Sequence, residues 1–346
     1  MVDIFKYEAL EAARQGMAVW NAWSKQHADS IADFSDTDFT QGKYAHIDFS
    51  DFVFNGPVYF DRARFGKAVF DRAIFQSTAT FERTLFEEEA SFKNAKFNKR
   101  CDFLRARFND DIGFQDAVFG DDALFLETSY SMHLSLSGTS FKADVTFLGA
   151  TFLGSVSFEG SDFEIVPDLC RSEFRKHVTF DSANVTYRTP AKKGDAAKYR
   201  RLKELAVLSR DHDKEHEFFA YELMSKRGHE VRGLELVPSY IYELSSDFGR
   251  SLRRPFGLLV LVWFAFGFAY TVYSEKAWEI GGGLLYSLNI LFSFVPGSLN
   301  RTKAIEGQIF SGTVPNLVNF LTILEGVFGI ALIFLFVLAI RNRFRV

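Results

Sequence analysis

The stretch DFLRARFNDDIGFQDAVF, residues 102–119, places phenylalanine at successive intervals of five, six and five residues. A β-strand returns to the same face at every second residue, so steps of five and six cannot both end on one face. An α-helix turns about 100° per residue, so a five-residue step ends ~140° away from where it began. The spacing therefore predicts a chain that turns a corner at each ring.

The same spacing continues far beyond this stretch in both directions. From Phe81 onward, four successive steps sum to 22 residues, so equivalent rings are expected to stack in columns about 4.8 Å apart, which gives roughly seven to eight coils. The corner residues are Phe34, Phe39, Tyr44, Phe49, Phe54, Phe60, Phe65, Phe70, Phe75, Phe81, Phe86, Phe92, Phe97, Phe103, Phe108, Phe114, Phe119, Phe125, Tyr130, Leu136, Phe141, Phe147, Phe152, Phe158, Phe163, Leu169, Phe174, Phe180 and Val185.

Two inward residues per corner, one large and one small, fit a square coil. The small or modest apolar residues stand two positions before the rings, at Ala95, Cys101, Ala106, Ala117, Ala123, Val145, Val156 and Ala183. The ten rings that we take as the core of the solenoid are Phe81, Phe92, Phe97, Phe103, Phe108, Phe114, Phe119, Phe125, Phe147 and Phe158.

At these residues the chain resembles the pentapeptide-repeat family, whose motif is A-(D/N)-L/F-x-x. The resemblance implies a right-handed quadrilateral parallel β-helix over residues 31–188, preceded by a helical cap over residues 1–30. In that cap Met17, Trp20 and Trp23 are expected to cover the open end of the first coil. The regular six-residue step departs from the motif and implies two bulged sides per coil.

Composition argues against several functions. The chain carries a net charge of −4, so it offers no broad basic surface and we expect no nucleic-acid partner. Residues 34–188 hold 24 acidic against 17 basic residues, but the two signs are interleaved, which favours a solvated exterior over a DNA-mimicking inhibitor. Only Cys101 and Cys170 are present, and both suit a reducing compartment.

Residues 189–250 have the composition of a helical connector. The sequence His212-Asp-Lys-Glu215-His216 matches the inverted zinc-protease motif, yet no other feature of that class accompanies it, and we interpret it as a solvated helix face. The chain has no Walker loop, no G-x-S-x-G and no C-x-x-C. We therefore expect no enzyme, no metal and no cofactor.

Residues 251–346 have the pattern of a transmembrane domain. Residues 255–273 carry no charge and residues 317–340 carry one, at Glu325, so both are long enough to cross a bilayer. Arginines precede the first segment and follow the second, which places both flanks in the cytoplasm and requires an even number of crossings. The uncharged segment between them is therefore expected to be re-entrant over residues 281–297, the alternative being an interfacial or extracellular hairpin.

Helix, re-entrant segment and helix are the layout of the bacterial potassium-channel pore family, which residues 252–344 resemble. LEGVFGIALIFLFVLAI is similar to the inner helix of that family, and LYSLNILFSFVPGS stands where its pore helix and filter lie. No T-V-G-Y-G is present, so potassium selectivity does not transfer. The candidate constriction is Ser293, Phe294, Val295, Pro296 and Gly297, and the candidate support and gating residues are Glu325, Gly326 and Gly329.

These expectations combine into a homotetrameric channel of a bacterial inner membrane. It would be multi-pass, contact membrane lipid, keep both termini cytoplasmic and conduct an inorganic ion, with the helix dipole favouring cations. Residues 239–256 would form an interfacial segment that transmits movement of the solenoid. The alternative is a membrane-anchored scaffold whose solenoid binds an unknown cytoplasmic protein.

Overall fold

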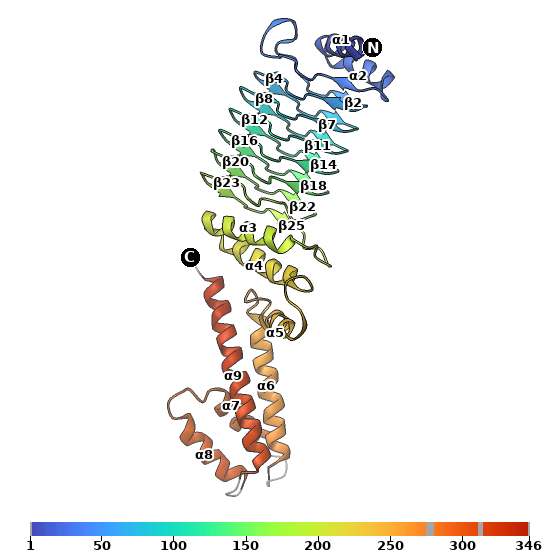
Figure 1. The fold of residues 1–346 in the computed structure, drawn as a ribbon. Coiled ribbons are helices and arrows are strands. Elements are labelled where there is room, and N and C mark those ends of the chain that lie inside the picture. The colour runs from blue at the N-terminus through green and yellow to red at the C-terminus, as the bar shows by residue number, and fades with distance from the viewer. Residues whose placement is uncertain (1, 275–279, 311–313, 345–346) are drawn as a thin grey trace. The chain divides into compact units, whose positions relative to one another are not determined.

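The computed structural model describes residues 2–274, 280–310 and 314–344 (Figure 1). The chain divides into two compact units, Met1–His229 and Glu230–Val346. The boundary between them falls inside the segment expected to be a connector, so the first part of that segment belongs to the N-terminal unit.

The N-terminal unit is a parallel β-solenoid of about seven turns with four sheets. The first sheet contains β1 (Ala32–Asp33), β3 (Val58–Tyr59), β7 (Ala79–Thr80), β11 (Cys101–Asp102), β15 (Ala123–Leu124) and β19 (Val145–Thr146). The second contains β2 (Val53–Phe54), β6 (Ile74–Phe75), β10 (Lys96–Phe97), β14 (Val118–Phe119), β18 (Ser140–Phe141), β22 (Asp162–Phe163) and β25 (Asn184–Val185).

The other two sheets complete each coil. The third contains β4 (Arg64–Phe65), β8 (Leu85–Phe86), β12 (Arg107–Phe108), β16 (Ser129–Tyr130), β20 (Thr151–Phe152) and β23 (Glu173–Phe174). The fourth contains β5 (Ala68–Val69), β9 (Ala90–Ser91), β13 (Ile112–Gly113), β17 (Leu134–Ser135), β21 (Val156–Ser157) and β24 (Val178–Thr179). Four sheets of two-residue strands give the square cross-section that the sequence predicts.

The rings stack in the columns that the 22-residue repeat predicts. Phe103 lies with its ring centroid 4.6 Å from that of Phe81 and 5.0 Å from that of Phe125, in nearly parallel planes. Phe125 and Phe147 continue the column at 4.8 Å. All ten rings taken as the core are buried, as are the small residues two positions before them. Burial of this many large rings is the main stabilising term of the unit.

The corners alternate between two geometries. The five-residue step from Phe81 to Phe86 contains a tight turn in which Arg83 has φ 55° and the amide of Thr84 donates to the Phe81 carbonyl. The six-residue step from Phe86 to Phe92 passes through a wider bend with no residue at positive φ. The strands on every side remain two residues long and pair in register, so no side of the coil is bulged and the expectation of bulged sides is wrong.

The first coil is longer than the others. Ala32 pairs with Val58, a separation of 26 residues, because a short 3-10 helix (η1, Gly42–Tyr44) extends out of the coil. Phe39 and Phe49 therefore occupy adjacent corners, and Tyr44 does not occupy a corner as expected. Tyr44 instead donates a hydrogen bond to Glu11 of the N-terminal cap over 3.1 Å.

Helices α1 (Val2–Arg14) and α2 (Met17–Gln26) cover the first coil. Trp20 is fully buried, lies against Phe34, Phe52 and Phe54, and donates its indole N–H to the Val53 carbonyl. Asn21 and Ser24 accept hydrogen bonds from the backbone amides of residues 53 and 55, at 2.7 and 2.9 Å. Met17 is 46% exposed, so its expected part in covering the coil is wrong. The cap satisfies the edge amides that an open solenoid would expose.

Helices α3 (Asp195–Ser209) and α4 (His212–Lys226) cover the opposite end of the solenoid. Phe218 of α4 packs edge-on against Phe180, and Arg201 of α3 donates to the Ser172 carbonyl over 2.7 Å. These helices were expected to join the solenoid to the membrane, and the structure instead packs them against the last coil.

Glu222 on α4 pairs with two cations of α3, and so joins the two capping helices, and with a third cation on α4 itself. Its carboxylate lies 3.0 Å from Arg200, 2.6 Å from Lys203 and 2.7 Å from Lys226, and its side chain is 4% exposed. Burial alone raises the pKa of this carboxyl, but the hydrogen bonds from Lys203, Lys226 and Arg200 outweigh burial and lower the pKa to about 2. Glu222 is therefore ionised in the folded protein at neutral pH.

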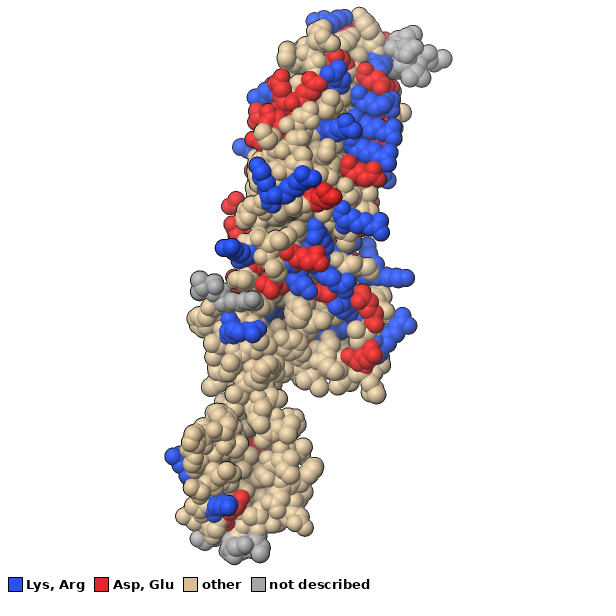
Figure 2. All heavy atoms as spheres, turned by 60° about the vertical axis from the view of Figure 1, so that its left-hand side comes forward, with Lys and Arg blue, Asp and Glu red and all other residues tan. Residues whose placement is uncertain are grey.

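The C-terminal unit is helical. It contains a 3-10 helix η2 (Gly233–Glu235) and the helices α5 (Leu236–Ser246), α6 (Arg253–Val272), α7 (Ile280–Leu291), α8 (Ser298–Ile309) and α9 (Asn316–Arg343). Helices α6 and α9 are long and apolar enough to cross a membrane. Many of their large apolar side chains are exposed, and the face seen in Figure 2 carries few charges over this unit. An apolar surface of this extent is typical of contact with lipid or with other protein chains.

Phe103→Ala is expected to lower the free energy of unfolding of the solenoid by about 3–5 kcal/mol, because it leaves a cavity between two stacked rings. Leu124→Ala, on the outward side of the neighbouring strand, is the matched control and should cost about 1 kcal/mol or less. Chemical unfolding of the full-length protein, followed by circular dichroism, measures both. Equal losses would contradict a core organised by ring columns.

Glu222→Gln is expected to destabilise the N-terminal unit by about 2–3 kcal/mol at pH 7, since the folded carboxyl has a depressed pKa. The stabilisation is complete above the unfolded pKa of about 4.3 and is lost as pH falls from there through about 2, so variant and wild type should converge in acid. Glu204→Gln, whose carboxylate is 51% exposed and pairs with Arg201, is the control. Thermal unfolding between pH 2 and pH 7 tests this, and a pH-independent difference would contradict it.

Candidate functional site

A buried carboxylate joins three helices of the C-terminal unit. Glu325, on α9, is fully buried. Tyr270 of α6 donates a hydrogen bond to Glu325 Oε2 over 2.7 Å, and Ser287 of α7 donates to Glu325 Oε1. Burying an unpaired polar group costs several kcal/mol. The hydrogen bonds from these two hydroxyls offset that cost and allow the carboxyl group to be buried here. One side chain of α9 therefore links all three helices.

Glycines bring the same three helices into close contact. A Cβ at Gly283 of α7 would collide with the Gly267 carbonyl and with Thr271 of α6. A Cβ at Gly329 of α9 would stand 2.8 Å from Leu291 Cδ2 of α7. Gly329, expected to be a gating glycine, thus occupies a point of close approach between helices. Small residues at helix contacts are typical of membrane proteins.

Gly326, the third predicted support or gating residue, is less constrained. It is half-buried, and a Cβ there would meet nothing within 4 Å in the described part of the chain. Its role as a support or gating residue stays a prediction.

Helices α7 and α8 form a hairpin that begins and ends beside the C-terminal end of α6 (Figure 1). Near the start of α7, a Cβ at Gly282 would stand 3.3 Å from Ile309 Cδ1, at the end of α8. Ser274, just after α6, donates to the carbonyl of the same Ile309 over 3.4 Å. The tip of α7 reaches Gly329, the fourteenth of the 28 residues of α9. The hairpin therefore extends along about half the length of α9.

A second carboxylate joins the two arms of this hairpin. Tyr286 of α7 donates a hydrogen bond to Glu306 of α8 over 2.9 Å. The ring of Tyr286 packs edge-on against that of Tyr270 at 4.9 Å and against Phe310 at 5.7 Å. Tyrosines on α6 and α7 thus contact each other, and each donates to a different carboxylate.

The turn between α7 and α8 contains the five residues predicted to form a constriction. Phe294 is 63% exposed and Val295 is 41% exposed, while Ser293, Pro296 and Gly297 are also on the surface. Within the turn, the carbonyls of residues 290, 292, 293 and 295 accept hydrogen bonds from the chain itself. The backbone here is coiled, and it does not present an extended row of carbonyls.

Sequence reasoning identified Glu325 but missed its partners. Tyr270, Ser287 and Tyr286 lie in largely apolar segments without charges, and a hydroxyl at membrane depth is itself a signal of an internal hydrogen bond. Sequence alone could not pair them with carboxylates, because the partners are 55, 38 and 20 residues away. Helix α8 was also missed, since its polar sequence resembles a loop.

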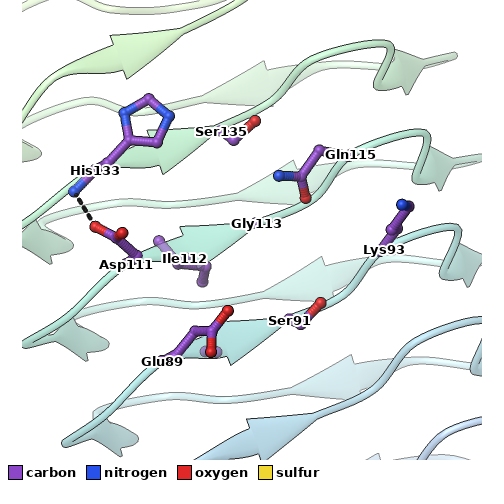
Figure 3. Close-up of a pocket in the computed structure, with 10 residues that line it drawn as sticks. Glu89, Ser91, Lys93, Asp111, Ile112, Gly113, Gln115, His133 and Ser135 are labelled. Atoms are coloured by element: carbon purple, nitrogen blue, oxygen red, sulfur yellow. Dashed lines mark hydrogen bonds between the residues drawn. The ribbon is translucent and has the colours of Figure 1, made fainter.

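The solenoid offers a separate candidate surface, a groove across the fourth sheet (Figure 3). Small outward residues, Ser91, Gly113 and Ser135, form its floor. Glu89, Asp111 and His133 line one edge, and Lys93 and Gln115 line the other, around a volume of about 340 Å³. The Asp111 carboxylate accepts a hydrogen bond from the His133 amide over 2.9 Å, so one edge is already internally bonded.

The H-x-x-E-H match does not form a metal site among the residues that the structure describes. His212 Nδ1 lies 3.1 Å from Glu215 Oε2, a contact within a single turn of α4. Across residues 2–274, 280–310 and 314–344 no group of three or more His, Cys, Asp or Glu side chains could hold a metal ion. Burial raises the pKa of both Cys101 and Cys170, to about 11 for Cys170, so neither thiol is activated.

Gly283→Ala is expected to destabilise the C-terminal unit by about 1–3 kcal/mol, because the added methyl group collides with the α6 backbone. Gly281→Ala is the matched control on the same helix, since a Cβ there meets nothing within 4 Å in the described structure. Thermal unfolding of the detergent-purified protein, followed by tryptophan fluorescence, compares the two. A control that unfolds as early as Gly283→Ala would rule out this close approach.

The comparisons with known proteins concern the solenoid alone. Residues 81–129 and 136–184 match the family model for pentapeptide repeats, in 9 copies. Comparisons with curated proteins and with solved structures give no significant match. The unmatched interval contains Tyr130, one of the rings that depart from phenylalanine, although β16 and β17 continue the coil through it. Residues 81–184 therefore carry pentapeptide repeats, folded as a parallel β-solenoid.

Proposed function

We propose that the C-terminal unit is the subunit of an ion-conducting pore in a bacterial inner membrane. The observation that carries the proposal is the α7–α8 hairpin, which enters and leaves at one end of α6 and extends half the length of α9. Helix α7 has 12 residues, about 18 Å, too short to cross a hydrocarbon core of about 30 Å. A pure anchor would need no such element between its two spans.

The charges at the helix ends support a multi-pass topology with cytoplasmic termini. Arg253 and Arg254 begin α6, and Arg341 and Arg343 end α9. Under the positive-inside rule both basic ends face the cytoplasm, so α6 and α9 cross in opposite directions. The hairpin then lies at the outer half of the membrane, as a re-entrant segment does.

Several copies are required, because two spanning helices cannot enclose a column of water. Resemblance to the potassium-channel pore family implies four copies around an axis. The exposed large apolar side chains of α6 and α9 are consistent with contact to lipid and to neighbouring copies. Glu325 would support the hairpin from behind through Ser287, without facing the axis.

The turn at the hairpin tip is the proposed constriction. Phe294 and Val295 project from the surface of the subunit, and the carbonyls around them are already hydrogen-bonded. The constriction would therefore be formed by apolar side chains, which gate by excluding water, and not by a ladder of carbonyls selective for potassium. The C-terminal end of α7 points toward this tip, so its dipole favours cations.

The solenoid would lie in the cytoplasm and act as a regulatory domain. It is joined to α6 through α5, and its exposed surface is paired internally by ion pairs between coils, such as Arg62 with Asp36 and Arg105 with Glu127. Nothing in this reading requires a reaction, a cofactor or a nucleic acid.

A membrane-anchored scaffold is the second candidate. The groove of about 340 Å³ over Ser91, Gly113 and Ser135 favours it, since polar edges and a floor of small residues suit a bound segment of a cytoplasmic protein. In that case α6 and α9 would serve only to hold the solenoid at the membrane.

Ion flux through the purified protein in liposomes distinguishes the two candidates. A pore should conduct, and Phe294→Ala should raise the flux several-fold by widening the constriction. Leu299→Ala, which removes a similarly exposed apolar side chain at the second residue of α8, is the control and should leave the flux unchanged. Reversal potentials in asymmetric salt then identify the ion. Absence of ion flux under all conditions would favour the scaffold.

A further inference from the structure

Helix α5 has an apolar face that is largely exposed in the described structure. Val237, Tyr240, Ile241 and Leu244 are 48, 53, 59 and 74% exposed. Their spacing of three, one and three residues places them on one side of the helix. Ser246, on the opposite side of the helix, is buried, so the apolar side of α5 faces outward.

The helix is held firmly against the ends of α6 and α9. After α5 the chain reverses through Asp247, Phe248 and Gly249, which all have positive φ. A Cβ at Gly249 would stand 3.0 Å from Tyr242 Oη and 3.1 Å from Asn342 Nδ2, so a glycine is needed at this contact. The guanidinium of Arg254 donates to the Glu243 carbonyl over 2.8 Å. The exposed face therefore has a fixed position relative to the two spanning helices.

Basic side chains lie at the same level of the unit. Arg250 and Arg254 pair with Asp247, at 3.0 and 3.7 Å. Arg253, Arg341 and Arg343 are exposed, and none has an ion-pair partner among the described residues of the chain. The last two end α9, where the helix dipole favours cations. An apolar face and unneutralised arginines thus occur together at one end of α6 and α9.

We propose that α5 and these three arginines form a binding site for anionic phospholipid at the cytoplasmic surface of the membrane. The arginines would bind the phosphate of the headgroup, and Ile241 and Leu244 would contact the upper part of the acyl chains. Tyr240 suits the boundary between the two regions. Charge complementarity selects an anionic lipid over a zwitterionic one, since juxtamembrane arginines attract negative leaflets.

The level of the site in the bilayer follows from α6 and α9 themselves. Both helices begin or end at these arginines, so their apolar lengths place the arginines at the interface. The inference requires only that α6 and α9 lie in a bilayer, and not that the protein conducts ions. The experiment below measures no current, so its failure and the failure of the pore are distinguishable.

The first test counts lipids bound to the full-length protein in detergent by native mass spectrometry. Phosphatidylglycerol should bind more tightly than phosphatidylcholine with the same acyl chains. R341Q/R343Q should weaken phosphatidylglycerol binding by about tenfold or more. R301Q/K303Q removes two basic residues from α8 and is the matched control, with binding unchanged. Equal binding of the two lipids, or equal loss in both variants, would overturn the proposal.

The second test locates the apolar face. A fluorophore attached at Leu244→Cys, with Cys170→Ser to remove the partly accessible thiol, is compared with one at Leu153→Cys on the solenoid. In vesicles of phosphatidylcholine and phosphatidylglycerol with brominated acyl chains, quenching is expected at position 244 and not at 153. Absence of quenching at 244 would assign this face to a protein contact, with a second copy or another part of the chain, and overturn the lipid site. Free glycerol 3-phosphate should not displace the lipid, and displacement would reduce the site to a phosphate site.

Discussion

Backbone pairing between successive coils is the constraint on which the N-terminal unit depends. Each two-residue strand pairs in parallel with its equivalent one coil later, and this spacing brings equivalent side chains to about the same separation as stacked aromatic rings. A flat ring at every corner therefore satisfies the pairing and fills the interior at once. The longer first coil is accommodated because the chain leaves the stack at Gly42–Tyr44, whereas the next coil repeats after 21 residues and stays within it.

A solenoid of this kind has two open ends, and the chain covers them by different means. At the first coil, Asn21, Ser24 and the Trp20 indole supply hydrogen bonds to the edge of β2, so the cap replaces a missing strand. At the last coil the contact is mainly apolar, through Phe180 and Phe218, and Glu222 holds the two covering helices together by charge. Both covers prevent the end strands from pairing with the strands of another molecule.

The C-terminal unit differs from the solenoid in where its polar groups lie. Its surface is largely apolar, and buried hydroxyl and carboxyl groups lie between its helices. Glycines at 267, 283 and 329 allow α6, α7 and α9 to approach closely, and hydroxyl groups satisfy the carboxylates of Glu325 and Glu306. These contacts give the short α7–α8 hairpin a defined position without a large apolar core. An inside-out distribution of this kind is what the pore and the lipid site proposed above both require.

The periodicity of the sequence determined the solenoid, its square section and its ring columns. A repeat of 22 residues can be recognised along the chain without any knowledge of tertiary contacts. The two uncharged or nearly uncharged segments determined the two long apolar helices, and the single charge in the second singled out Glu325. Tertiary structure alone decided that Tyr44 leaves the stack, that Met17 is exposed and that the sides of the coils are not bulged. It also decided that Tyr270 and Ser287 donate to Glu325 and that α8 folds back beside α7. The physical reason is the same in each case: these features depend on contacts between segments 20 to 55 residues apart, and no pattern within one segment carries that information.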